Sequence, residues 1–108
     1  MAIRGMFNQV QEYALRETID FDGEFVDASG IDATPSAATL YVKKPDGTVT
    51  TYAYPGPSIT NPSTGLLVCS VLLDVSGYWS YRWEAIGAIG AADEKVIKVR
   101  SSVFFPAA

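Results

Sequence analysis

The sequence predicts an all-β fold, a sandwich or a barrel, and two observations support that prediction. The residue types enriched in strands, which are Val, Ile, Thr, Tyr, Phe and Trp, account for 38 of the 108 residues. Turn residues also recur at fairly even spacing, as in Pro45-Asp46-Gly47 and Ser63-Thr64-Gly65, and the runs between them are short. Short β-rich runs between regular turns are typical of β-sandwiches and β-barrels.

Composition limits the classes of function that the chain can have. At 108 residues it has the size of one domain, and 48% apolar residues give it enough apolar surface to fold. The absence of histidine and the single cysteine exclude Ser-His-Asp and Cys-His catalysis, Cys/His zinc sites and an internal disulfide. The net charge of −4 disfavours nucleic acid, because a phosphate backbone requires a basic partner. We therefore expect no enzyme, no cofactor and no nucleic-acid partner.

The sequence also lacks the signals of a membrane or exported protein. Its longest apolar stretches, Leu66–Cys69 and Val103–Ala108, are far shorter than the ~18 residues of a membrane span. The N-terminal segment has no apolar core of the kind that a secretory signal needs. We expect no membrane partner, and synthesis in a reducing cytoplasm, where a single free cysteine is ordinary.

The first half of the chain is predicted to contain four strands after an N-terminal arm at residues 1–12. Tyr13–Phe21 alternates apolar and polar residues, and Asp22-Gly23 is interpreted as a tight turn into a short strand at Glu24–Asp27. An irregular loop to residue 36 follows. Ala38–Lys43 and Thr48–Tyr54 then form a hairpin, with a proline-rich loop after it.

Three strands are predicted in the second half, which makes seven in all. The strand Gly65–Leu73 is apolar on both faces, so we expect it to be central in its sheet or covered on both sides. Its Cys69 is interpreted as a small buried hydrophobe. Tyr78–Ala85 alternates strictly, and Glu94–Arg100 is the last strand, after a hairpin loop at Gly87–Ala92.

The aromatic row of the strand 78–85 has two interpretations. Trp79, Tyr81 and Trp83 share one face, opposite Ser80, Arg82 and Glu84. Such a row can stack on sugar rings, but with strict polar alternation opposite it we expect it to anchor the core. Surface tyrosines are then the better sugar-binding candidates: Tyr41, Tyr52, Tyr54 and Tyr78.

Two groups of acidic residues were candidates for chemistry. The dense cluster between Asp20 and Asp27 could hold calcium, but its spacing departs from the EF-hand loop, and a solvated turn is the favoured interpretation. Asp74 and Glu84 could form a carboxylate pair, but nothing in the sequence fixes their separation. We therefore predict no catalytic residue and no metal site.

The chain has more apolar residues than a small sandwich can hide. The C-terminal residues 103–108 carry no charge, the arm has a weak apolar stripe, and the strand 65–73 has apolar residues on its outward face. Exposed apolar patches usually mark interfaces, although a tail folded back over its own sandwich is the alternative. The interface candidates are Met6, Phe7, Val10, Leu66, Val68, Leu72, Val103, Phe104 and Phe105.

The order of features from Asp22 to Val99 resembles a family of small immunoglobulin-like proteins encoded among the structural genes of tailed phages. The strongest element is a Pro-Asp-Gly hairpin followed by a Gly-x-Trp-x-Tyr-x-Trp strand. The matching segments are Asp22-Gly23, Val26-Asp27, the run from Leu40 to Thr50, Ser63-Thr64-Gly65, the run from Leu73 to Ala85, and Ile97-Lys98-Val99.

This resemblance implies a fold and a role. The fold is an immunoglobulin-like β-sandwich of about seven strands over residues 13–108, with a short N-terminal arm and an apolar C-terminal tail. The role is a non-enzymatic virion subunit at the neck or tail, which contacts other virion proteins and assembles through its termini into a ring or repeated copies. A capsid decoration (cement) protein is the first alternative. The second is a module that binds host-surface carbohydrate, which predicts that at least two of the four surface tyrosines line a shallow groove.

Overall fold

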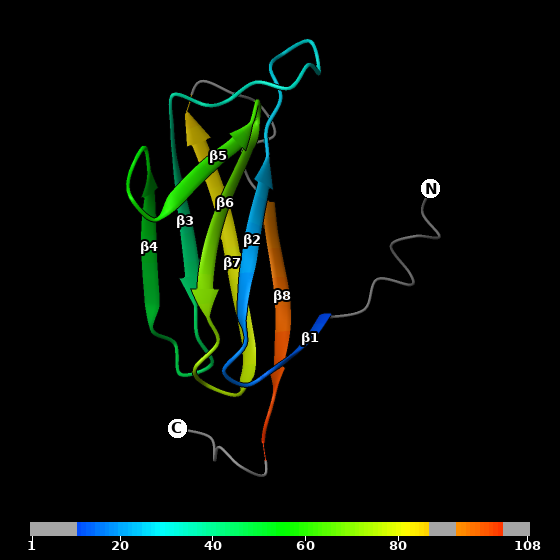
Figure 1. The fold of residues 1–108 in the computed structure, drawn as a ribbon, viewed down its shortest axis with the longest axis vertical. Helices are drawn as coiled ribbons and strands as arrows, with labels where there is room; N and C mark the ends of the chain where they lie inside the picture. The colour runs from blue at the N-terminus through cyan, green and yellow to red at the C-terminus, as the bar shows by residue number, and fades with distance from the viewer. Residues whose placement is uncertain (1–10, 87–92, 103–108) are drawn as a thin grey trace, which may run out of the picture.

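The computed structural model of the chain describes residues 11–86 and 93–102. Among these residues the structure has eight strands and no helix (Figure 1), and hence no helix that could cross a membrane. The strands are β1 (Gln11–Ala14), β2 (Thr18–Glu24), β3 (Ala37–Lys43), β4 (Val49–Tyr54), β5 (Ile59–Ser63), β6 (Leu66–Leu72), β7 (Gly77–Ile86) and β8 (Asp93–Arg100).

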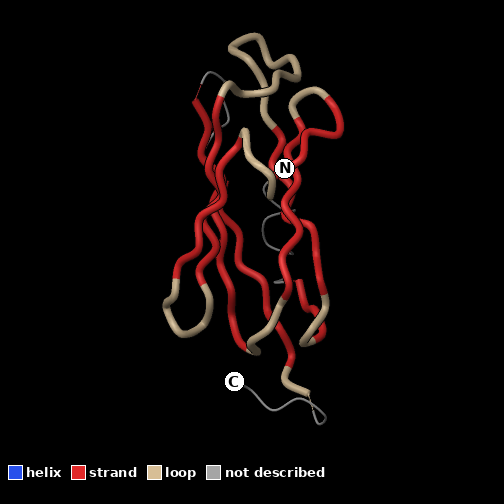
Figure 2. Tube along the Cα trace, turned by 60° about the vertical axis from the view of Figure 1, so that its left-hand side comes forward, coloured by secondary structure: helices blue, strands red, loops and turns tan. Residues whose placement is uncertain are grey.

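The strands form two sheets that pack face to face, which confirms the predicted sandwich (Figures 1 and 2). One sheet has the order β1-β8-β7-β3-β4 and the other the order β2-β6-β5. Neighbouring strands are antiparallel except β1 and β8, which run parallel. Strand β6 is central in its sheet, as its two apolar faces predicted.

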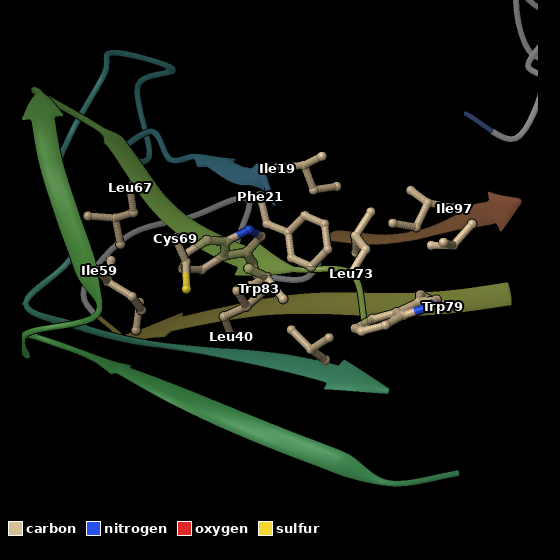
Figure 3. Close-up of a cluster of buried hydrophobic side chains, with 14 of the residues drawn as sticks. Ile19, Phe21, Leu40, Ile59, Leu67, Cys69, Leu73, Trp79, Trp83 and Ile97 are labelled. Atoms are coloured by element: carbon tan, nitrogen blue, oxygen red, sulfur yellow. The ribbon is translucent and has the colours of Figure 1, made fainter. Parts of the chain in front are cut away.

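The core lies between the sheets and contains the tryptophans of β7 (Figure 3). Trp79 and Trp83 are 1% and 0% exposed, which confirms that the aromatic row anchors the core. The indole Nε1 of Trp79 donates a hydrogen bond to the carbonyl oxygen of Val75 at 2.9 Å. Phe25 meets Trp83 edge to face, with 6.1 Å between ring centroids. The alternation of apolar and polar residues in β7 therefore predicts correctly which of its side chains are buried.

The predicted strand 13–21 is wrong, because the chain changes sheets within it. Strand β1 joins the five-stranded sheet and β2 the three-stranded sheet. Between them Arg16 has a φ of 76°, and the amide of Glu17 donates to the carbonyl oxygen of Ala14 at 3.1 Å. Tyr13 and Leu15 still pack against the core, as Ile19 does from the other sheet. Apolar alternation continues across the turn, so it conceals the change of sheet.

Asp22-Gly23 is not a turn but lies inside β2, and no strand follows at 24–27. Strand β2 ends at Glu24, beyond which Val26 forms an isolated bridge to Asp32. A Cβ on Gly23 would lie 2.9 Å from the rings of both Phe25 and Trp83. The glycine therefore permits close packing rather than chain reversal.

The predicted loop after β4 contains an unpredicted strand, β5, which raises the number of described strands to eight. Its pairing with β6 is irregular, with a register shift between Thr60 and Ser63. The side-chain nitrogen of Asn61 donates to the carbonyl oxygens of Ser63 and Leu66, in place of part of the regular ladder. Pro62 is tolerated because β5 is an edge strand, and this proline concealed the strand in the sequence.

The hairpin of β3 and β4 is confirmed. The amide of Gly47 donates to the carbonyl oxygen of Lys44 at 2.9 Å, and Gly47 has the positive φ of 91° that the turn requires. Strands β7 and β8 pair from Gly77 with Val99 to Trp83 with Asp93. The hairpin loop predicted at 87–92 lies outside the described residues, as do the termini at 1–10 and 103–108.

Candidate functional site

The outward face of the three-stranded sheet combines an apolar row with an acidic row. Leu66 and Val68 of β6 are half-buried there, and Leu72 is 52% exposed. The acidic row lies on the neighbouring strand β2, where Asp22 pairs with Val68 and Glu24 with Leu66. Side chains at such paired positions lie side by side. We call this surface the acid–apolar face; it comprises Asp20, Asp22, Glu24, Leu66, Val68 and Leu72.

The carboxylates of the acid–apolar face have no cation beside them on their own sheet. Strands β2, β5 and β6 contain no Lys or Arg. Burial raises the pKa of Asp22, and repulsion from Asp20 and Glu24 raises it further, with Lys95 opposing both. Asp20 accepts a hydrogen bond from the hydroxyl of Ser70 at 2.6 Å. Three negative charges thus concentrate on a partly apolar surface.

The outward face of the five-stranded sheet is hollowed, with a volume of about 620 Å³. Val49 and Val96 border this hollow and are 53% and 48% exposed. Nearby on the same face, Tyr78 is 59% exposed. We call this surface the hollowed face; the hollow is lined by Tyr41, Lys43, Val49, Ser80, Tyr81, Arg82, Glu94, Lys95 and Val96.

The charges on the hollowed face are largely neutralised within the chain. The guanidinium of Arg82 contacts a carboxylate oxygen of Glu84 and one of Glu94, both at 2.7 Å. These two hydrogen bonds raise the pKa of Arg82. Lys98 pairs with Glu12 at 3.8 Å. Lys43 has no ion pair within the described residues, so it leaves a positive charge in the hollow.

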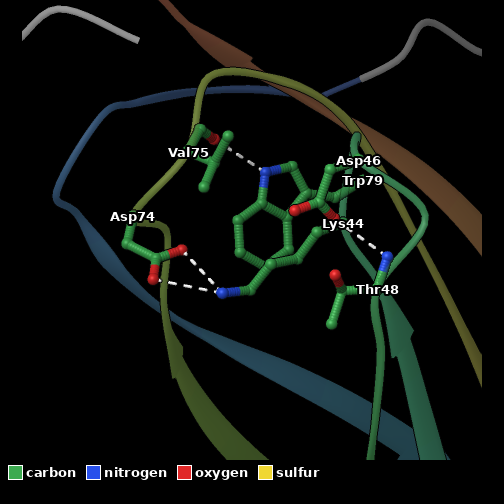
Figure 4. A network of polar contacts seen from close by, with 6 residues as sticks. All are labelled: Lys44, Asp46, Thr48, Asp74, Val75 and Trp79. Atoms are coloured by element: carbon green, nitrogen blue, oxygen red, sulfur yellow. Dashed lines mark hydrogen bonds and ion pairs between the residues drawn. The ribbon is translucent and has the colours of Figure 1, made fainter. Parts of the chain in front are cut away.

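A polar network covers the core at the end of the sandwich where β7 begins (Figure 4). The Lys44 ammonium bonds to Asp74 at 3.1 Å and lies 5.6 Å from the ring centroid of Trp79. Asp46 accepts a hydrogen bond from the amide of Thr48, which lowers the pKa of Asp46. These contacts secure the hairpin turn against the core.

The structure does not bring the candidate carboxylate pair together. Asp74 precedes β7 and binds Lys44, whereas Glu84 lies near the other end of β7 and binds Arg82. The seven residue-to-residue steps from Gly77 to Glu84 span about 23 Å of strand. Each carboxylate therefore has its own cation and no shared substrate position.

The other sequence candidates for chemistry have structural roles. The acidic cluster is divided between β2 and the loop after it, where Asp27 accepts hydrogen bonds from the amides of Ser29 and Ile31. In the part of the chain that the structure describes, no group of three or more Cys, Asp or Glu could hold a metal ion. Cys69 is 1% exposed, and burial raises the pKa of its thiol.

Three predicted interface residues lie where the sequence placed them. Leu66, Val68 and Leu72 point outward from β6. The other six, Met6, Phe7, Val10, Val103, Phe104 and Phe105, lie outside the described residues.

The four tyrosines proposed as surface residues separate into different environments. Tyr41 lines the hollow, whereas Tyr52 and Tyr54 pack partly buried against the core. Tyr78 is exposed and holds Lys98 5.8 Å from its ring centroid. Val49 and Val96 were not among the predicted interface residues, although their outward positions in alternating strands were a usable signal.

Comparison with known proteins identifies the fold. No family model matches the chain, and no curated protein matches it. A solved structure described as "Crystal structure of the Lin-41 filamin domain" superposes with a TM-score of 0.64 and 16% identity, over 86% of each chain. The fold is an immunoglobulin-like β-sandwich. At this identity the likeness concerns the fold alone.

Proposed function

We propose that the chain is a non-enzymatic structural subunit of a tailed-phage virion, located at the neck or tail and present in repeated copies. The observation that carries the proposal is the acid–apolar face. The interior is already filled by side chains such as Trp79 and Trp83, so the outward row of Leu66, Val68 and Leu72 has no use inside the domain. Apolar side chains gathered on an outward face are typical of protein interfaces.

The distribution of reactive groups supports a structural role rather than catalysis. The sequence has no histidine, and its one thiol is sealed in the core. Asp74 and Glu84 are each neutralised by a cation. A β-sandwich whose candidate catalytic groups are buried or paired is suited to a structural role beside other subunits.

The two motifs that carry the phage resemblance contact each other in space. Gly77 opens the Gly-x-Trp-x-Tyr-x-Trp strand with a φ of 124°, and a Cβ there would lie 2.8 Å from Cγ of Pro45. Lys44, the residue before that proline, lies over Trp79. The hairpin and the strand therefore form one packing unit, which supports reading them as a joint motif.

The carbohydrate alternative has less support. It required two of the four candidate tyrosines to line one groove, and within the described residues only Tyr41 lines the hollow. A capsid decoration protein would use the same apolar contacts, so it remains an outcome of the test below.

The proposal is tested on purified particles of the phage that encodes the chain. We expect mass spectrometry to find the chain in intact particles, and gold-labelled antibody to mark the neck or tail. Label spread over the capsid shell would replace our location with that of a decoration protein. Absence of the chain from washed, infectious particles would overturn the proposal.

Deletion of either terminus tests the predicted contacts. Removal of residues 1–10, which stops short of β1, or of residues 103–108 is expected to abolish incorporation into particles while leaving the β-sheet circular dichroism spectrum intact. The matched control is a short insertion at Gly30, an exposed loop glycine with nothing near its Cβ position. If the truncated chains incorporate as well as this control, the termini are not the contacts.

A further inference from the structure

We propose that copies of the chain stack in a head-to-tail manner, with the acid–apolar face of one copy seated on the hollowed face of the next. This inference rests on the proposed function, because it names the partner of the same apolar row. A contact between two different faces of identical copies generates a ring when the rotation closes, and a filament when it does not.

The two faces carry opposite charge. The strands of the acid–apolar face contain three carboxylates on its outward side and no Lys or Arg. On the hollowed face, the carboxylates at outward positions of the five strands are Glu12, Glu84 and Glu94, and each is paired with Lys98 or Arg82. Lys43 and Arg100 also lie at outward positions, and neither has an ion pair within the described residues. These two cations can meet the unpaired acids of another copy.

The apolar parts of the faces also match. Val49 and Val96 border the hollow and are half-exposed, with Tyr41 beside them. The apolar row of β6 contains Leu72, also about half-exposed. Seating this row in the hollow removes apolar groups of both copies from water.

Like faces are poorer partners for each other. Two acid–apolar faces would oppose three carboxylates to three carboxylates, and juxtaposed like charges are costly. Two hollowed faces would leave the hollows facing each other and the apolar row of β6 uncovered. The mixed contact is the arrangement that satisfies both faces.

The size of the contact predicts weak pairing that becomes stable through repetition. Two strands of seven residues and one of five form a face of at most roughly 14 by 23 Å, or about 320 Å². A standard interface covers about 800 Å² on each partner. A single stacked contact should therefore be weak and concentration-dependent, and a closed ring would gain from having every copy bound twice.

The test uses two charge-swapped variants of the full chain, with mass measured by light scattering and sedimentation across concentration. The acid-swapped variant is Asp22→Lys with Glu24→Lys, and the base-swapped variant is Lys43→Glu with Arg100→Glu. All four side chains are exposed, and circular dichroism checks that each variant folds. The wild-type chain is expected to associate with rising concentration, and each variant alone should need at least about tenfold more protein.

An equimolar mixture of the variants is the decisive arm. Each swapped face then finds an oppositely charged face on the other variant, so association should return to the wild-type level. Net charge cannot explain weaker association of the acid-swapped variant, because that swap moves the formal charge from −4 to zero, which by itself favours association. Wild-type association by either variant alone, or a mixture that stays monomeric, would overturn the stacking.

A wild-type chain that stays monomeric at ~1 mM would also overturn the stacking. The proposed function would then be judged separately by particle labelling, since a subunit can enter a particle through other proteins. If both variants associate as strongly as the wild type, this contact is rejected. The particle experiment could still find the chain as a repeated subunit.

Discussion

The two outer faces of the sandwich treat their charges in opposite ways. On the hollowed face, Arg82 joins Glu84 on its own strand to Glu94 on the neighbouring strand, and Lys98 reaches Glu12 across another strand pair. On the acid–apolar face, the carboxylates lie beside one another with no cation on their sheet. Both faces cover the same core, so the interior does not impose this difference.

The difference separates surface charges that are paired within the chain from those that have no ion pair among the described residues. A charge that is already paired within the chain gains little from an ion pair with another protein. Unpaired acids beside the half-buried Leu66 and Val68 cost the folded chain stability, because the sheet holds like charges together next to apolar surface. Such a feature is more easily understood if the surface is covered in use.

The largest expected effect is on the free energy of unfolding, and it distinguishes an inward leucine of β6 from an outward one. Leu67 is 0% exposed, and Leu72, five residues along the same strand, is 52% exposed. Replacement of Leu67 by Ala should cost about 2–5 kcal/mol of unfolding free energy, since it leaves a cavity. Leu72→Ala should change it by less than about 1 kcal/mol. Urea unfolding measures both; a similar loss for Leu72→Ala would mean that the outward row is structural.

Removal of one charge should have a smaller effect on stability, with opposite sign on the two faces. Asp22→Asn removes a negative charge from a repelling group, so the urea midpoint should rise. Arg82→Met removes the cation that neutralises two glutamates, so the midpoint should fall. The effect of Arg82→Met, and the part of the Asp22→Asn effect that comes from repulsion by Asp20 and Glu24, should shrink in 1 M salt, which screens exposed charges. A fall in the midpoint for Asp22→Asn would contradict the described difference between the faces.

The strands that the sequence predicted well are those whose alternation ends in clear turn chemistry. Strand β7 alternates between buried tryptophans and polar residues, and the Pro45-Asp46-Gly47 turn sets the hairpin before it. The N-terminal segment was mispredicted because the inward positions of β1 and β2 stay apolar although they belong to different sheets. Alternation reports which side of a strand faces the core, and it carries no information on which sheet holds the strand.

The sequence predicted the apolar row of the candidate site but not its acidic row or the hollow. The row of Leu66, Val68 and Leu72 follows from alternation along one strand. The position of the acidic residues of β2 beside this row could not be inferred, because β2 pairs with β6 and the paired residues lie about 50 apart in the sequence. The hollow depends on four strands that meet only in the folded sheet, and it was invisible for the same reason.

The smallest effect concerns pH and compares two aspartates with opposite shifts. Burial, with repulsion from Asp20 and Glu24, raises the pKa of Asp22 above the ordinary aspartate value of 3.8. The amide and hydroxyl of Thr48 lower the pKa of Asp46 below the same value. The folded chain thus binds a proton at Asp22 more readily than the unfolded chain, so this group's contribution to stability falls as pH rises from 3.8 through the folded pKa. Asp46 does the reverse, since its contribution is present above pH 3.8 and is lost as pH falls through its lowered pKa.

Carboxyl ¹³C NMR titration can measure both groups in one sample. The midpoint of Asp22 should lie above that of Asp46. In the variant Glu24→Gln, the midpoint of Asp22 should move down but stay above the ordinary aspartate pKa of 3.8, because burial is the first cause of its shift. The midpoint of Asp46, which lies on the β3–β4 turn, should not move and serves as the internal control. If Asp22 does not respond to Glu24→Gln, the acids of β2 do not act on each other, and the contrast between the two faces loses its electrostatic basis.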